Sequence, residues 1–143
     1  MVTLDDLTPE ARDKMGMLVV RMEHRGVTVR PYCTLRDPFT QARLWRQSRS
    51  AEEIAAECDE CRTIGAPRIA ACIELVGPQH GKWATNAMPG LSWHQHGEAA
   101  DFMVIVDGKA VWDGSAPGYV ALETEAAGLG MKGGARFGRG DAN

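Results

Sequence analysis

The stretch of residues 91–106 constrains the fold of this chain more than any other part. Residues 91–102 contain two histidines and two acids, whereas residues 103–106 form an uninterrupted apolar run followed by an Asp-Gly pair. An apolar run that ends at such a turn signal is typical of a buried strand. We therefore expect His94 on a loop that enters the strand and Asp101 near the start of the strand.

His94 and Asp101 are candidate ligands of one metal ion. Imidazole nitrogen and carboxylate oxygen both bind zinc, and a catalytic zinc ion has three protein ligands and a water molecule. The stretch therefore supplies two of the three protein ligands. His96 lies two residues from His94 and would point to the same side of an extended chain, which makes it an alternative ligand. His80 is a weaker alternative, and Glu98 is more typical of a solvated acid than of a general base.

The same stretch resembles the signature of a zinc peptidase family. This family contains the D-alanyl-D-alanine carboxypeptidases and dipeptidases and the phage-type L-alanyl-D-glutamate endopeptidases. The signature S-x-H-x-x-G-x-A-x-D is filled at all five fixed positions, by Ser92, His94, Gly97, Ala99 and Asp101. The resemblance covers roughly residues 27–141 and also includes Arg36, Gln41, Leu44, Arg49 and the run Thr85-Asn86-Ala87.

The resemblance implies a role for each matching residue. His94 and Asp101 correspond to zinc ligands of the family. Arg36 corresponds to an arginine that reaches into the active site and stabilises charge on the substrate, and Gln41 to the glutamine that braces this region. Asp141 corresponds to the acid that acts as general base.

Two further residues of the motif region are expected to contact the substrate or to support the site. Ser92 resembles a hydroxyl that contacts the substrate or a zinc ligand, and it is not a nucleophile because no base is placed to activate it. Trp93 is a candidate wall of the substrate cleft, with burial in the core as an equal alternative. Gly97 is expected in a tight turn that brings His94 back toward Asp101.

The third zinc ligand of the family does not lie within these 143 residues. In the family it is a histidine three residues after the general base, and the sequence ends two residues after Asp141. We therefore expect a domain that lacks its C-terminal tail, with weaker zinc binding and little hydrolysis as it stands. In the glycine-rich segment before that end, Lys132 replaces the tryptophan that the family usually has.

The cysteines allow several interpretations. Cys58 and Cys61 form a C-x-x-C pair, and Cys33 and Cys72 could in principle complete a four-thiolate zinc site. The outer spacings are irregular, however, and the pair lies in a helix-like stretch. Reduced thiols are therefore the favoured interpretation, with a disulfide or a structural metal as alternatives.

Length and composition favour a single domain, here residues 1–143. The content of 44% hydrophobic and 24% charged residues is that of a globular protein, with no stretch long enough for a transmembrane helix. A net charge of −3 gives no support for nucleic-acid binding. The N-terminus lacks the features of a signal peptide, so we expect a monomer that is cytoplasmic as made and acts on the cell wall after release.

The sequence predicts an α+β fold: a small, mainly antiparallel sheet that carries the zinc site, packed with helices. The resemblance implies more specifically the D-Ala-D-Ala carboxypeptidase or hedgehog-like fold. Residues 50–80 are expected to form a helical insertion that consists of two helices, with a break between them near Pro67. The other expected elements are helices over residues 9–25, from Pro38 and over 117–127, a strand over 27–32 and a hairpin at 107–108.

These features favour a zinc metallopeptidase that hydrolyses peptide bonds in peptidoglycan stem peptides. The small size, the N-terminus and the Arg36–Gln41 unit favour an endolysin-type L-alanyl-D-glutamate endopeptidase. One alternative is a catalytically inactive peptidoglycan-binding module of the same fold, because the third ligand is missing. The other alternative is a D-alanyl-D-alanine carboxypeptidase or dipeptidase.

Overall fold

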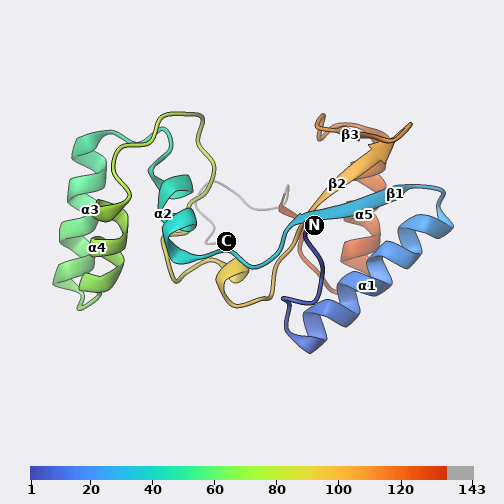
Figure 1. Ribbon diagram of the computed structural model, residues 1–143, viewed down its shortest axis with the longest axis horizontal. Coiled ribbons are helices and arrows are strands. Elements are labelled where there is room, and N and C mark those ends of the chain that lie inside the picture. Colours follow the sequence, from blue (N-terminus) through green and yellow to red (C-terminus); the bar gives the residue numbers. More distant parts are fainter. Residues whose placement is uncertain (135–143) are drawn as a thin grey trace. The chain divides into compact units, whose positions relative to one another are not determined.

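The computed structural model describes residues 1–134, and this part of the chain has an α+β architecture. It contains five α-helices, a short 3-10 helix and a three-stranded antiparallel sheet (Figure 1). The chain divides into two compact units, which we name the sheet unit (residues 1–35 and 96–134) and the helical unit (residues 36–95). The predicted α+β class and small antiparallel sheet are confirmed, whereas the specific fold family stays a prediction.

The sheet unit is built on three antiparallel strands in the order β1–β2–β3. Their bounds are Thr28–Cys33 for β1, Asp101–Val106 for β2 and Lys109–Val111 for β3. The β2–β3 connection is the predicted hairpin: Asp107 and Gly108 both have positive φ, 49° and 75°, as a type I′ turn requires. The strand that the sequence predicted over residues 27–32 is β1, shifted by one residue along the chain.

Helices α1 (Pro9–His24) and α5 (Pro117–Gly128) pack against this sheet (Figure 1). Helix α1 begins as predicted, with the Thr8 hydroxyl accepting a hydrogen bond from the Ala11 N–H and a proline in the first turn. The buried residues of this core come from both helices and two strands: Leu18, Met22, Val29, Val104 and Ala126. The alternation of β1 explains the arrangement, because Val29 is buried between two exposed neighbours.

An ion-pair group joins α1 to α5 at the edge of this core. Glu125 accepts a hydrogen bond from Arg25 at 2.6 Å and lies 3.5 Å from Arg21. The hydrogen bond from Arg25 holds the pKa of Glu125 below its ordinary value. The ion pairs of Glu125 therefore stabilise the packing of α5 on α1 at pH values where Glu125 is ionised. This contribution to stability is lost as the pH falls through the pKa of Glu125.

The helical unit contains α2 (Pro38–Arg46), α3 (Ala51–Thr63) and α4 (Pro67–Leu75). Helix α3 begins with a complete capping box between Ser50 and Glu53. The two helices predicted within residues 50–80 are thus present, separated near Gly65, and their role as an insertion in a single domain stays a prediction. The buried core of the unit consists of Ala42, Trp45, Ile54, Cys58, Cys61, Ala70, Cys72 and Ile73.

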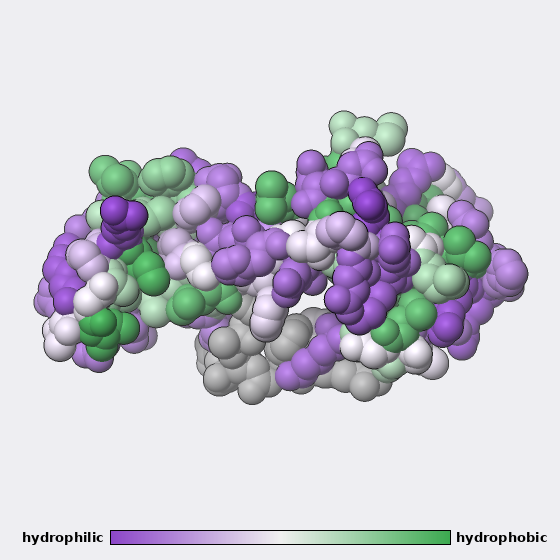
Figure 2. All heavy atoms as spheres, turned by 90° about the horizontal axis from the view of Figure 1, so that it is seen from below, coloured by the Kyte–Doolittle hydropathy of each residue, from purple (hydrophilic) through white to green (hydrophobic). Residues whose placement is uncertain are grey.

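Among residues 1–134, no helix combines the length and the apolar character needed to cross a membrane. Hydrophilic residues cover much of the face seen in Figure 2, and hydrophobic residues occur between them in small groups.

Gly118 tests the packing of α5 on the sheet. A Cβ at this position would lie 2.7 Å from Cγ1 of Val104, a rigid side chain that is buried in the core. We expect Gly118→Ala to lower the free energy of unfolding by about 1–3 kcal/mol through overpacking, as measured by urea denaturation. Gly16→Ala is the matched control: a Cβ there meets no atom within 4 Å, and alanine should stabilise α1 by about 0.5–1 kcal/mol. Equal effects of the two substitutions would contradict the close contact.

Candidate functional site

The two predicted zinc ligands lie at the positions that the sequence suggested. Asp101 is the first residue of β2, and His94 lies in the short 3-10 helix η1 (Trp93–Gln95) that precedes it along the chain. The backbone holds η1 in place, because the His94 carbonyl accepts a hydrogen bond from the Arg36 N–H at 3.1 Å. The Gln95 N–H donates to the Ser92 carbonyl at 3.0 Å and closes the turn.

Cys33, His94 and Asp101 are candidate metal ligands among residues 1–134. Cys33 and Asp101 belong to the sheet unit, where they are partners across β1 and β2, whereas His94 belongs to the helical unit. All three side chains are partly buried. Thiolate sulfur, imidazole nitrogen and carboxylate oxygen are the three ligand types that zinc binds in proteins.

From the sequence, Cys33 was considered only as a member of a four-thiolate site with the other cysteines, and not beside Asp101. It ends β1, and the register of the sheet shifts between Pro31 and Cys33, so that Cys33 rather than Tyr32 is the partner of Asp101. A shift of this kind re-aims a side chain at a sheet edge. The signal in the sequence was weak, because a register irregularity is a property of the strand pair and not of either strand alone.

The other three cysteines lie in the core of the helical unit. Cys58 and Cys61 are almost completely buried, and none of the four cysteines forms a disulfide bond within residues 1–134. Burial raises the pKa of the thiols of Cys58, Cys61 and Cys72, which keeps them protonated at neutral pH. They behave as small apolar residues, as Cys61 shows with its sulfur 3.7 Å from that of Met88.

A buried glutamine orients the predicted substrate-binding arginine. Gln41 has no exposed surface. Its Oε1 accepts a hydrogen bond from Nη1 of Arg36 at 2.9 Å, and its Nε2 donates to the carbonyl of Ala87 at 2.8 Å. The amide thus uses both ends, and its orientation fixes the guanidinium of Arg36. Asp37 is the N-cap residue of α2, so Arg36 lies immediately before the start of this helix.

Arg49 connects two further positions of the family resemblance. Its Nη2 donates to the carbonyl of Thr85 at 3.1 Å, and its guanidinium lies 4.3 Å from the ring centre of Trp45. Burial lowers the pKa of Arg49, although the group remains charged at neutral pH. The Thr85 hydroxyl accepts a hydrogen bond from the Ala87 N–H, so the segment that Gln41 contacts is itself braced. Positions of the family resemblance that are far apart in the sequence, such as Arg49 and Thr85, are therefore in contact within the helical unit.

The remaining motif residues differ in exposure. Ser92 is 2% exposed, which suits a supporting hydroxyl better than one that contacts a substrate, whereas Trp93 is 53% exposed. Gly97 has a φ of +69°, and a Cβ there would lie 3.1 Å from the carbonyl oxygen of Asp6. Its carbonyl accepts a hydrogen bond from the Thr8 N–H at 2.9 Å. Glycine is therefore required both by the backbone conformation and by the close approach of the N-terminal segment.

The alternative ligands considered from the sequence are not members of the metal-ligand group. His80, His96 and Glu98 are all exposed. Asp141, the predicted general base, lies outside the described residues, so its placement stays a prediction.

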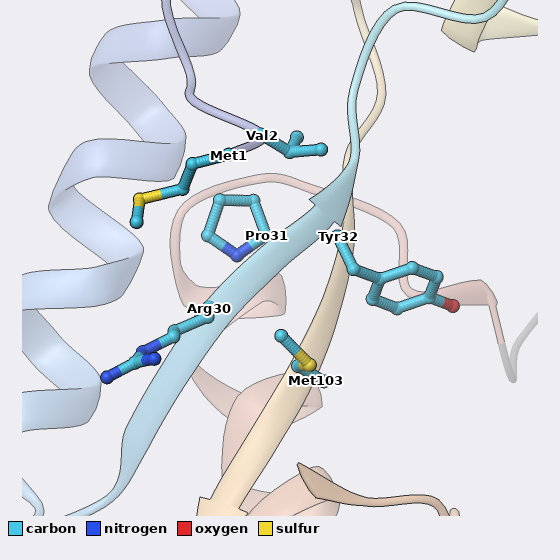
Figure 3. A pocket seen from close by; sticks show the side chains of 6 residues that line it. All are labelled: Met1, Val2, Arg30, Pro31, Tyr32 and Met103. Carbon is cyan, nitrogen blue, oxygen red and sulfur yellow. The ribbon is translucent and has the colours of Figure 1, made fainter.

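The sheet unit also carries an open hollow of about 640 Å³. Figure 3 shows Arg30 and Tyr32 on β1, Met103 on β2, and the first two residues of the chain beside Pro31. Tyr32 makes an edge-to-face contact with Trp112, with ring centres 5.5 Å apart. None of the predicted site residues lines this hollow, and its wall is mainly apolar.

Gln41→Leu tests whether the buried amide supports the fold around Arg36. The carbonyl of Ala87 would lose its partner, and we expect the free energy of unfolding to fall by about 1–3 kcal/mol. Urea denaturation followed by tryptophan fluorescence measures the effect, because Trp45 is buried in the same unit. The control, Gln47→Leu at the partly buried end of α2, should stay within about 0.5 kcal/mol of the unchanged protein. A silent Gln41 variant would show that these hydrogen bonds carry no net stability.

The sequence matches no protein-family model and no curated protein. The resemblance to the zinc peptidases therefore depends on the residues quoted above, and membership of that family stays a prediction.

Proposed function

We propose that this protein is a zinc-dependent peptidase that hydrolyses peptide bonds in peptidoglycan stem peptides. The observation that carries the proposal is the 2.9 Å hydrogen bond by which the buried amide of Gln41 holds the guanidinium of Arg36, beside a peptidase signature that is filled at all its fixed positions. His94 and Asp101 are the metal positions of that signature. We also propose that the chain has the D-Ala-D-Ala carboxypeptidase or hedgehog-like fold, which belongs to the α+β class and contains a small antiparallel sheet.

The residues of the chain would divide the work of hydrolysis as follows. His94 and Asp101 would hold the zinc ion, which supplies a Lewis acid and lowers the pKa of a bound water to about 7. Arg36 would bind the negative charge that develops on the scissile carbonyl or is present on a substrate carboxylate. Gln41 would keep the guanidinium of Arg36 in one orientation through their 2.9 Å hydrogen bond. Asp141 would accept the proton of the attacking water and pass it to the leaving amine.

Among peptidoglycan bonds, we propose the L-alanyl-D-glutamate bond as the target. The stem peptide carries free carboxylates beside this bond, and a braced guanidinium is suited to recognise a carboxylate through two parallel hydrogen bonds. The protein would act as a monomer on the cell wall after its release from the cytoplasm. Ser92 and Trp93 would support and line the site, the buried hydroxyl from within and the exposed indole from the substrate side.

Hydrolysis of synthetic stem peptides tests this function. We expect zinc-dependent cleavage of the L-alanyl-D-glutamate bond, at the low rate predicted above for residues 1–143, detected by mass spectrometry of the products, with loss on chelation and recovery when zinc is returned. His94→Ala and Asp101→Asn should each lower the rate by more than about 100-fold, because changes in groups that only support a ligand already cost 10–100-fold. His80→Ala serves as the control, since His80 is exposed and outside the ligand group, and its rate should not change.

The same assay distinguishes the alternatives. Cleavage at D-alanyl-D-alanine instead would assign the protein to the carboxypeptidases or dipeptidases. Binding of purified peptidoglycan without cleavage, by protein with its full zinc content, would contradict the proposal in favour of a binding module.

Arg36→Lys tests the role of the guanidinium. Lysine keeps the positive charge, but Gln41 cannot hold a lysine ammonium group in the same fixed orientation. Lysine also cannot offer two parallel N–H groups to a carboxylate. We expect kcat/KM to fall at least about 10-fold, equivalent to about 1.4 kcal/mol of lost transition-state stabilisation. Arg43→Lys, on an exposed position of α2, is the matched control and should leave kcat/KM unchanged. Equal kinetics of the two variants would remove Arg36 from the mechanism.

A further inference from the structure

We propose that the hollow beside Tyr32 and Trp112 binds the glycan strand of peptidoglycan. The partner is thus a polymer of N-acetylated amino sugars, whose rings present apolar C–H faces, acetamido groups and hydroxyl groups. The choice of this polymer rests on the proposed function, but the binding itself requires neither zinc nor hydrolysis. All the protein residues involved belong to the sheet unit.

The hollow lies on the face of the sheet that points away from α1 and α5. Val29 and Val104 are partners across β1 and β2, and both are buried in the core beneath these helices. Arg30 and Met103 are the adjacent pair of partners, so their side chains point to the opposite face, and both line the hollow. Figure 3 shows Arg30 and Tyr32 along β1, with Met103 on the neighbouring strand.

Trp112 extends the hollow to the third strand. Val111 is the partner of Val104, so the residue that follows it, Trp112, points away from the helices. Strand β2 separates β1 from β3, and the edge-to-face contact of Tyr32 with Trp112 therefore crosses β2. Tyr32 is 45% exposed and Trp112 is 68% exposed. The contact holds two aromatic rings in place while much of their surface faces solvent.

Exposed rings and apolar side chains on one open face suit a sugar chain. Met1 and Val2 add further exposed apolar surface at the rim of the hollow, and apolar patches of this kind mark binding surfaces. The volume of about 640 Å³ is within the range of about 300–1,000 Å³ that is typical of ligand sites. Tyrosine and tryptophan provide rigid contact area at a low cost in conformational entropy, and the C–H face of a pyranose ring packs on such rings.

The polar groups of the hollow are donors that match the oxygen atoms of a sugar. Arg30 carries five N–H donors, and the hydroxyl and acetamido oxygens of the glycan are acceptors. A single positive side chain does not suit a polyanion such as a nucleic acid, which requires a basic surface. An added peptide strand is also disfavoured, because Pro31 on the edge strand β1 has no N–H to donate.

The hollow is adjacent to one residue of the proposed zinc site. Asp101 precedes Met103 by two residues on β2, and side chains at this spacing point to the same face of a strand. In peptidoglycan, the L-alanine of the stem peptide is the residue that is attached to the sugar. A glycan in the hollow therefore places the first peptide bonds of the stem beside Asp101.

An NMR titration of the unchanged, metal-free chain tests the inference without any activity measurement. The probe is triacetylchitotriose, a neutral trisaccharide of N-acetylglucosamine, and the protein is labelled with ¹⁵N. We expect shifts of the backbone amides of Arg30, Tyr32 and Met103 and of the indole N–H of Trp112. Cellotriose, which lacks acetamido groups, should bind at least about 5-fold more weakly. Shifts confined to the helical unit, no shifts at millimolar trisaccharide, or equal binding of cellotriose would overturn the inference.

Trp112→Ala tests the aromatic contact. The side chain is largely exposed, so the variant should fold, and we expect the Kd for triacetylchitotriose to rise at least about 10-fold. Met17→Ala is the matched control, because Met17 is an exposed apolar residue of the same unit that lies on α1. Its Kd should equal that of the unchanged chain. A Kd that is the same in the Trp112 variant would remove the aromatic pair from the binding site.

The outcomes separate this inference from the proposed function. Trisaccharide binding that depends on Trp112, in a protein that cleaves no stem peptide, would support the glycan site and reject the peptidase. Zinc-dependent cleavage by a protein that binds no trisaccharide would support the peptidase and reject the glycan site. If both hold, the unchanged chain should have a lower KM for stem peptides attached to glycan than for free stem peptides, and Trp112→Ala should remove this difference.

Discussion

The antiparallel pairing of β1 with β2 is the constraint on which the candidate site depends. It sets Val29 opposite Val104 in the core under α1 and α5, and after the register shift it sets Cys33 opposite Asp101. Because side chains alternate between the faces of a strand, a slip of one residue would expose the valines and separate Cys33 from Asp101. The hydrophobic core and the pairing of Cys33 with Asp101 are therefore fixed by the same register, and the burial of the valines stabilises that pairing.

A second constraint acts within the helical unit, where the amide of Gln41 is completely buried. A buried amide is stable only when its donors and acceptors are paired, and Gln41 meets this requirement through Arg36 and the carbonyl of Ala87. The arginine is thus oriented by a group that has no alternative solvent partner. Such an arrangement suits a guanidinium that must present a fixed face to a carboxylate, because little side-chain entropy remains to be lost on binding.

Local signals made much of the fold predictable. The proline and capping residues marked the starts of α1, α2 and α3, the Asp-Gly pair marked the hairpin, and the apolar run marked β2. The resemblance indicated that Gln41 braces the region of Arg36. The hydrogen bond of Gln41 to the carbonyl of Ala87 was not predicted, since no local pattern reports a contact between residues 46 apart. Cys33 was missed because its place beside Asp101 depends on a register shift, which neither strand encodes by itself. The role of Asp141 concerns a residue outside the described part of the chain and stays a prediction.

The most direct test of this account is a crystal structure of the zinc-loaded protein with anomalous diffraction measured on both sides of the zinc absorption edge. The account predicts one zinc ion bonded to His94 and Asp101 at about 2.0–2.2 Å. A zinc ion held by other residues, or crystals of zinc-treated protein without an anomalous peak at these two side chains, would contradict it.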